Sequence, residues 1–160
     1  MIINRILVKS LSKAIKHYSV LFITGPRQSG KTTLSKKLFS EYIYKNLEDP
    51  ETRLFAKNDP KNFLSQSNNL IIDEIQRVPE LLSYIQVMVD SDNKKKFVIT
   101  GAQNILVSQK ISQSLAGRVA IFNLLPFAFE EIINTSFEKK DICKQMLFGF
   151  YPRVYDRLLN

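Results

Sequence analysis

Short apolar runs alternate with helical patterns along this chain, and that alternation constrains the fold more than any other feature. The runs have the length and β-branched character of buried strands, and they span residues 19–24, 42–47, 69–74, 95–100 and 118–124. Helical patterns separate them, starting at Lys31, after Asp49-Pro50, after Asp59-Pro60, over 79–90 and over 103–115. This order predicts a three-layer α/β/α sandwich around a mostly parallel five-stranded sheet.

The two ends of the chain read as helical. Apolar residues spaced three and four apart predict a helix with one buried face from Ile2 to Ala14, with Ile6 and Leu11 on that face. Further helices are expected over 126–133 and 139–148, whereas the last twelve residues complete no recognisable element. We therefore expect one domain over residues 1–134, and a helical extension over 135–160 that leads towards a further domain.

Composition excludes several classes of protein. The 160 residues are 44% hydrophobic and 24% charged, so the chain can bury a core and is neither disordered nor collagen-like. Its longest uncharged apolar stretch, around residues 19–26, is far too short to cross a bilayer. One cysteine and one histidine offer no disulfide and no histidine-based zinc site. A cytoplasmic protein without a membrane partner is expected.

The strongest local signal is the sequence GPRQSGKTT, which lies between the first predicted strand and the helix that follows it. It matches the pattern G-x-x-x-x-G-K-[ST], in which two glycines allow successive backbone N–H groups to surround an anion. The helix adds the positive end of its dipole. We expect Lys31 to reach the β- and γ-phosphates of ATP and Thr32 to bind Mg²⁺. The residues predicted to hold the nucleotide are Gly25, Pro26, Arg27, Gln28, Ser29, Gly30, Lys31, Thr32 and Thr33.

A second signal is the acidic pair that ends the third predicted strand, in LIIDE. Asp73 is placed to face Thr32 and to hold the Mg²⁺ through water. Glu74 is placed to activate a water molecule that attacks the γ-phosphate. Gln76 and Arg77 follow, and they either relay nucleotide state to a partner or begin a loop that Pro79 ends.

These segments together resemble the N-terminal ATPase module of a prokaryotic AAA+-type family, whose members carry a C-terminal domain after it. The resemblance covers residues 3–132 and rests on GPRQSGKTTL, NLEDPETRLFAKNDPKNFL, LIIDEIQRVPELLSYIQ, FVITGAQN and SLAGRVAIFNLLPFAFEE. It implies that Thr100 is a sensor that helps Glu74 orient water, and that Arg118 is an arginine finger given to a neighbouring subunit of a homo-oligomer. The alternatives are a strand-end cap for Thr100 and a structural ion pair for Arg118.

Two positions depart from the family pattern. Relatives usually have Thr-Gly-Ser where this chain has Thr100-Gly101-Ala102, so a hydroxyl group near the sensor is missing. The match ends at Gly149-Phe150-Tyr151-Pro152, where relatives tend to have Gly-Gly-Tyr-Pro. The expected function is Mg²⁺-dependent ATP binding with hydrolysis to ADP and phosphate. The alternative from another class is a nucleotide-controlled switch or scaffold with little turnover.

The charge distribution adds a third hypothesis. The net charge is +8, and residues 1–47 carry nine Lys and Arg side chains against one acid, Glu41. Such a surface is either simply solvated or attracts a polyanion, such as nucleotide phosphates or nucleic acid. A nucleic-acid-associated ATPase therefore stays open.

Overall fold

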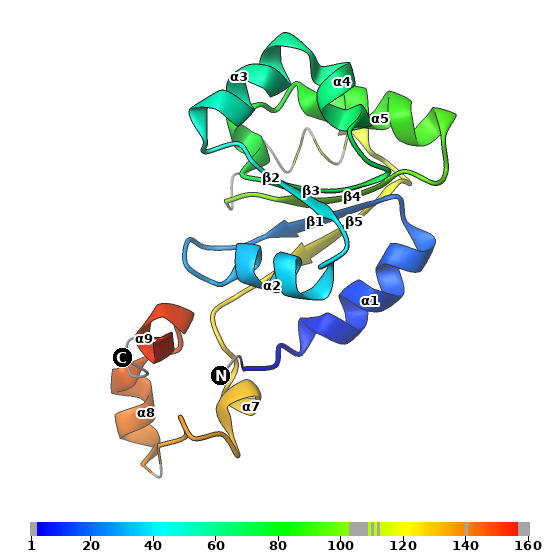
Figure 1. Cartoon of the computed structure of the whole chain (residues 1–160). Coiled ribbons are helices and arrows are strands. Elements are labelled where there is room, and N and C mark those ends of the chain that lie inside the picture. The colour runs from blue at the N-terminus through cyan, green and yellow to red at the C-terminus, as the bar shows by residue number, and fades with distance from the viewer. Residues whose placement is uncertain (1–2, 103–108, 110, 112, 140, 157–160) are drawn as a thin grey trace.

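The sheet has five strands, all parallel to their neighbours (Figure 1). The computed structural model describes residues 3–102, 109, 111, 113–139 and 141–156. The strands are β1 (Val20–Thr24), β2 (Ile43–Asn46), β3 (Asn69–Asp73), β4 (Lys96–Thr100) and β5 (Val119–Asn123). Their order across the sheet is β2-β3-β4-β1-β5. All five predicted strands are confirmed, and each is one or two residues shorter than its predicted range.

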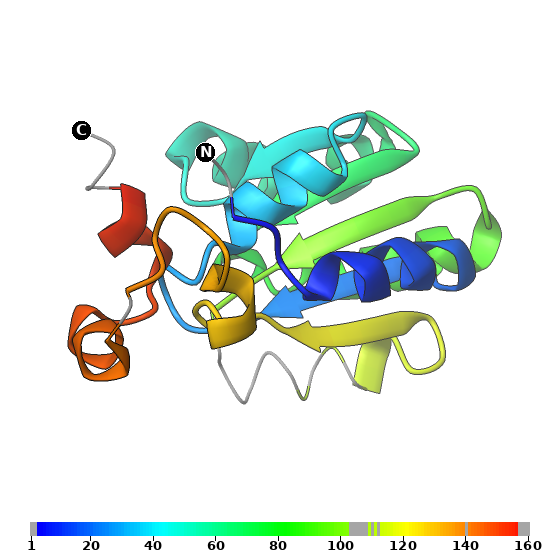
Figure 2. The same cartoon turned by 90° about the horizontal axis from the view of Figure 1, so that it is seen from below.

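Helices cover both faces of the sheet, which confirms the predicted three layers (Figures 1 and 2). On one face lie α1 (Leu7–His17) and α2 (Lys31–Leu38). The other face carries α3 (Pro50–Asn58), α4 (Pro60–Ser65) and α5 (Leu81–Ser91). Helices α3 and α4 begin where the Asp-Pro pairs predict, because the carboxylates of Asp49 and Asp59 accept N-cap hydrogen bonds from the backbone.

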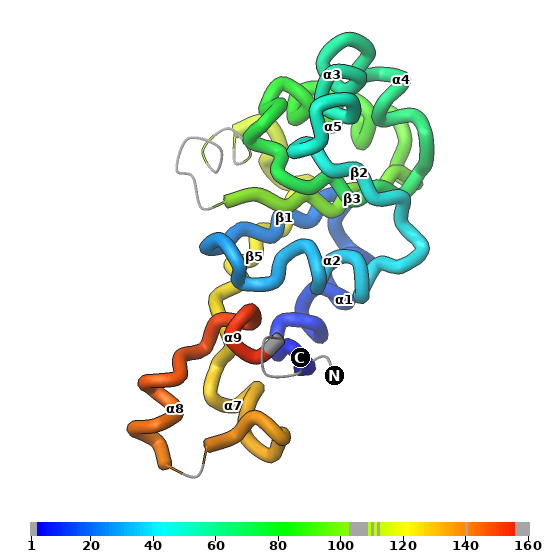
Figure 3. Tube along the Cα trace, turned by 60° about the vertical axis from the view of Figure 1, so that its left-hand side comes forward, coloured from blue at the N-terminus to red at the C-terminus, as the bar shows by residue number. Residues whose placement is uncertain are grey.

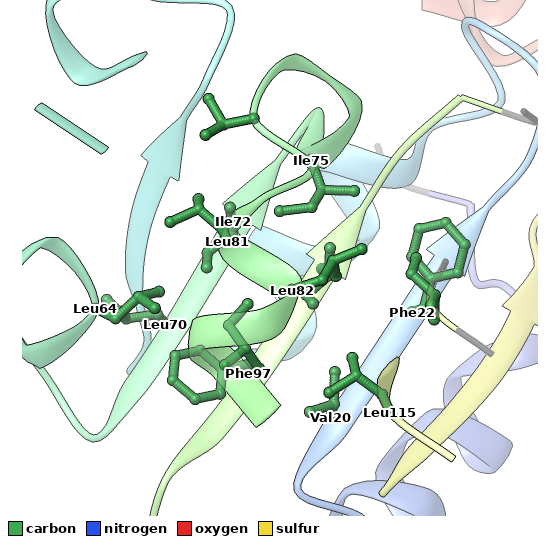
Figure 4. Close-up of a cluster of buried hydrophobic side chains, with 14 of the residues drawn as sticks. Val20, Phe22, Leu64, Leu70, Ile72, Ile75, Leu81, Leu82, Phe97 and Leu115 are labelled. Carbon is green, nitrogen blue, oxygen red and sulfur yellow. The ribbon is translucent and has the colours of Figure 1, made fainter. Parts of the chain in front are cut away.

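The hydrophobic core lies in two layers because the central strands are buried on both faces. Val20 and Phe22 of β1 point into the cluster under α3, α4 and α5 (Figure 4), while Leu21 and Ile23 point into the cluster under α1 and α2. Strand β5 is only partly buried. The near-continuous apolar sequence of β1, β3 and β4 follows from this burial.

The N-terminal helix starts later than its periodicity predicts. It begins at Leu7 and ends at His17, and Ile6, predicted on the buried face, is 61% exposed. The backbone N–H of Ile6 donates to the Glu131 carboxylate, a contact with a distant segment that local periodicity cannot reveal. Leu11 is fully buried, as predicted.

The C-terminal segment lies outside the three layers, below α2 in Figure 3, and its side chains form a third hydrophobic cluster. Three short helices build it: α7 (Phe129–Ile132), α8 (Ile142–Phe148) and α9 (Pro152–Asp156). The prediction that the last twelve residues complete no element is wrong, because α9 places Tyr155 in this cluster. Ile3 also belongs to the cluster, whose other members are Phe127, Ile132, Phe137, Phe148, Phe150, Val154 and Tyr155.

Most aromatic residues of the C-terminal segment pack in this cluster, whereas Phe129 and Tyr151 are exposed. The helix predicted over 103–115 lies mostly outside the described residues. No helix in the described part of the chain is long and apolar enough to span a bilayer.

Candidate functional site

The candidate site lies at the carboxyl edge of the sheet, where three central strands end side by side. Strand β1 leads into the glycine-rich loop 25–30, β3 ends at Asp73 and β4 ends at Thr100. Because β4 is inserted between β1 and β3, Thr100 stands between the loop and the acidic pair. Ligands of open α/β sheets bind at this edge.

The glycine-rich loop requires glycine at its first position. Gly25 has φ +147°, and a Cβ there would lie 2.1 Å from the Leu124 carbonyl oxygen. Gly30 has φ +93° and is the last residue before α2. The loop therefore passes against β5 and turns into the helix with a backbone that side chains at these positions would disrupt.

The Lys31 side chain lies along this loop. Its ammonium group donates to the carbonyl oxygens of Gly25 at 3.0 Å and Pro26 at 2.9 Å. Burial lowers the pKa of Lys31, and the negative charges of Glu74 and Asp73 oppose that shift. A buried cation thus lies between the loop and the acidic pair.

Asp73 is the centre of a polar network that joins four elements, α2, β2, β3 and β4. Its Oδ2 accepts hydrogen bonds from the Thr32 hydroxyl at 2.8 Å and the Tyr44 hydroxyl at 2.7 Å. Its Oδ1 accepts from the Thr100 hydroxyl. The residue is 4% exposed, so its charge is held by these donors rather than by bulk water.

Glu74 follows in the left-handed backbone region, with φ 60°. Its N–H donates to the Thr100 hydroxyl oxygen at 3.3 Å, and its carboxylate accepts from the Gln76 amide. The structure thus brings together Lys31, Thr32, Asp73, Glu74 and Thr100. A positive φ at a residue other than glycine is uncommon and costs backbone energy, a feature often found at functional sites.

Sequence reasoning missed Tyr44, which reaches the site from β2. The pairing of β2 with β3 sets Asn46 opposite Asp73, so the Tyr44 hydroxyl can reach the carboxylate. Burial, followed by the hydrogen bond to Asp73, raises the pKa of Tyr44, so the hydroxyl is a constant donor at neutral pH. Only the strand order could have revealed this contact.

Replacing Tyr44 by phenylalanine should lower the free energy of unfolding by about 1–2 kcal/mol, since a hydrogen bond to a charged group is lost. Urea denaturation measures the change. Tyr42→Phe is the matched control, because no side-chain hydrogen bond of Tyr42 is found in the described structure. Equal effects of the two substitutions would show that the Tyr44–Asp73 bond adds nothing to stability.

Arg118 lies at the opposite edge of the sheet. It directly precedes β5, whose first residue pairs with Val20 at the start of β1, far from the loop that follows β1. Its guanidinium forms an ion pair with Asp90 of α5, with Nη2 2.9 Å from Oδ2. The chain itself therefore shows the structural ion pair, and Arg118 does not reach the site of its own subunit.

The remaining loop residues differ in exposure. Arg27 and Gln28 are exposed, and Ser29 is fully buried. Thr33, in the first turn of α2, lines a neighbouring cavity of about 220 Å³. Apolar side chains from the N-terminal segment, α2 and the C-terminal cluster line this cavity, among them Ile3, Val8, Leu34, Phe127 and Pro152.

The parallel sheet order and the glycine-rich loop after β1 together define a P-loop nucleotide-binding protein. A family model described as an AAA domain matches residues 17–133, and the chain belongs to this family. At the family level it is thus a nucleotide-binding P-loop ATPase of the AAA+ type, which confirms the resemblance found in the sequence.

Curated relatives are longer than this chain. The uncharacterized protein Rv2008c of Mycobacterium tuberculosis is 40% identical over 121 residues, which are 71% of this chain and 26% of the relative. The uncharacterized protein MJ1544 of Methanocaldococcus jannaschii is 28% identical over 179 residues, 96% of this chain and 39% of the relative. The chain therefore spans about a quarter to two fifths of these relatives.

Solved structures support the fold. The Walker-type ATPase of Pyrococcus abyssi superposes with a TM-score of 0.56 at 16% identity, covering 81% of this chain and 55% of that one. A second structure is a signal transduction ATPase with numerous domains from Pyrococcus horikoshii, which has a tetratricopeptide repeat sensor. It superposes with a TM-score of 0.60 at 19% identity. Here 94% of this chain and 28% of that one are covered.

Proposed function

We propose that this chain binds ATP with Mg²⁺ and hydrolyses it slowly to ADP and phosphate. The observation that carries the proposal is the convergence of Lys31, Thr32, Asp73, Glu74 and Thr100 at one edge of the sheet. These groups supply a cation, a metal-binding pair, a base and a polar orienting group within one site.

The phosphates would be held by the loop 25–33. Backbone N–H groups of the loop and the N-terminus of α2 offer donors and partial positive charge to an anion. The Lys31 ammonium lies among carbonyl oxygens, and exchanging these neutral acceptors for a phosphate oxygen gives it stronger, charge-assisted bonds.

Thr32 and Asp73 fit a Mg²⁺ site. Both present oxygen atoms, the ligands that Mg²⁺ prefers, and these oxygens lie 2.8 Å apart. A single carboxylate and hydroxyl leave the other positions to water and phosphate oxygens, the usual arrangement for this ion. When bound, Mg²⁺ would neutralise the charge that develops on the phosphates.

Glu74 is the base for hydrolysis. A water oxygen attacks the γ-phosphorus, its proton passes to the Glu74 carboxylate, and the bond to the β-phosphate oxygen breaks to release ADP. Thr100 contributes by holding Asp73 and the backbone N–H of Glu74, so it fixes the acidic pair relative to the loop.

The base of the nucleotide would lie in the apolar cavity next to the loop. Gly30, Thr33 and Lys37 line the cavity on the side of the loop and α2, and Pro152 and Tyr155 line it on the other. A flat, apolar ring can be buried there while the phosphates stay in the loop.

A switch with little turnover is the second candidate. The Gln76 amide binds the Glu74 carboxylate and so competes with an attacking water for it. Ala102 supplies no hydroxyl near Thr100. Both observations favour slow chemistry, and a measured turnover of the bound nucleotide distinguishes the two functions.

Arg118 as a finger for a neighbouring subunit, and with it a homo-oligomer, remains a proposal. A cytoplasmic location and a nucleic-acid partner are also proposed. The surface for nucleic acid would be formed by exposed lysines of α1 and α2, namely Lys9, Lys13, Lys16 and Lys36. A steep fall in nucleic-acid affinity with added salt would support that partner.

The site assignment is tested by Lys31→Ala. We expect about a hundredfold loss of MgATP affinity in calorimetry, because charge-assisted bonds to the phosphates are removed. The fold should be retained, since the ammonium donates its hydrogen bonds only to carbonyl oxygens of the loop. Lys13→Ala, on the exposed side of α1 and away from the cavity, is the control for a lysine-to-alanine change within a helix. Unchanged affinity in the Lys31 variant would refute the assignment of this loop.

A further inference from the structure

Arg5, just before α1, contacts two segments that are far from it in the sequence, the phosphate loop and residues 125–131. Its Nη1 donates to the Ser29 carbonyl oxygen of the phosphate loop at 2.9 Å. Its Nη2 donates to the Leu125 carbonyl oxygen at 2.6 Å, after β5. Its Nε lies 3.0 Å from Oε2 and 3.1 Å from Oε1 of Glu131 in α7. The Arg5 side chain is only 9% exposed, so these bonds replace its hydration.

Glu131 is bound just as fully. One carboxylate oxygen accepts from the Ile6 backbone N–H at 2.7 Å, and the other from the Ala128 backbone N–H at 3.0 Å. The side chain is 5% exposed. Glu131 thereby ties the start of α7 to the start of α1 and holds the Arg5 guanidinium beside the loop.

The bond to Ser29 fixes the orientation of one peptide group in the loop. A trans peptide is planar, so its C=O and the following N–H point in opposite directions. With the Ser29 carbonyl held towards Arg5, the Gly30 N–H must point away from Arg5. Gly30, with φ +93°, has little steric restraint of its own, so an outside contact is needed to fix it.

We propose that Arg5 is a positioning residue for the anion-binding loop, and that with Glu131 it couples nucleotide binding to the C-terminal cluster. The proposal rests on nucleotide binding at this loop. Arg5 also lies over the Phe127 ring, 4.8 Å from its centroid, and Phe127 packs in that cluster. A phosphate bound in the loop therefore stabilises the same orientation of the Ser29–Gly30 peptide group that Arg5 holds. By linkage, it also stabilises the position of α7, which Glu131 connects to Arg5.

The test compares affinity with stability in wild type, Arg5→Gln, Arg5→Lys and Lys9→Gln. Lys9, an exposed lysine of α1, controls for the lost charge. Calorimetry uses MgATP and inorganic tripolyphosphate, which has no base and reports the loop alone. We expect Arg5→Gln to lose about tenfold in affinity for both ligands, the effect of one lost positioning hydrogen bond. Arg5→Lys should lose less, and Lys9→Gln under twofold.

A purely structural ion pair would lower the melting temperature of Arg5→Gln and leave both affinities unchanged, which would overturn the proposal. If wild type binds neither ligand, the proposed function fails as well. Wild-type binding with an unaffected Arg5 variant overturns only the positioning role.

Hydrogen exchange on wild type provides evidence that needs no substitution. Saturating inorganic tripolyphosphate, which has no base to contact Phe127 in the cavity, should slow backbone amide exchange in residues 126–133 and leave residues 50–58 of α3 unchanged. Protection confined to residues 25–33 would overturn the coupling. This measurement decides the point even if the Arg5 variants do not fold.

Discussion

Replacing Glu74 by glutamine should lower the rate of ATP hydrolysis by roughly 10²–10⁴-fold, the usual contribution of a general base. The amide has nearly the same shape but accepts no proton from water. Affinity for MgATP should be retained, since Lys31, Thr32 and Asp73 do not depend on the Glu74 side chain for their hydrogen bonds.

The measurement is single-turnover release of phosphate alongside calorimetric affinity. Glu80→Gln is the matched control, because Glu80 is an exposed carboxylate that precedes α5. Equal rates in wild type and Glu74→Gln would remove Glu74 from the mechanism. Tight binding with negligible turnover in wild type would instead favour the switch.

Substitution of Arg118 by alanine should lower the rate on the order of 10³-fold in the oligomer if this arginine is given to a neighbouring subunit. Because Arg118 lies at the edge of the sheet opposite its own loop, it can act only on another subunit's nucleotide. The specific activity of wild type should then rise with protein concentration. Arg118→Ala should abolish that rise without weakening ATP binding.

Asp90→Asn separates the finger from the ion pair. It weakens the contact to Arg118 and leaves the arginine in place, so a finger keeps its activity in this variant. If the pair is only structural, Arg118→Ala and Asp90→Asn should lower the melting temperature alike and leave the concentration dependence of the rate unchanged. The measurements are the specific activity over a dilution series and the melting temperature, for wild type, Arg118→Ala and Asp90→Asn.

Much of the fold follows from local sequence alone. The strands were predictable because buried parallel strands need apolar, β-branched runs, and the starts of α3 and α4 because an aspartate before proline is a local N-cap. The loop 25–33 was also predictable from local sequence, because its glycines, lysine and threonine occur at a short, fixed spacing. Asp73 and Glu74 could be placed because they end a buried strand.

Other features depended on which segments become neighbours. The order β2-β3-β4-β1-β5 brings Thr100 between the loop and Asp73, and pairs β2 with β3 so that Tyr44 reaches the same carboxylate. Arg5 and Glu131 are 126 positions apart, and Glu131 also accepts a hydrogen bond from the Ile6 N–H just before α1. Periodicity and motif spacing describe only neighbours along the chain. The tertiary structure alone decided these contacts, because they depend on strand order and on where the C-terminal cluster packs.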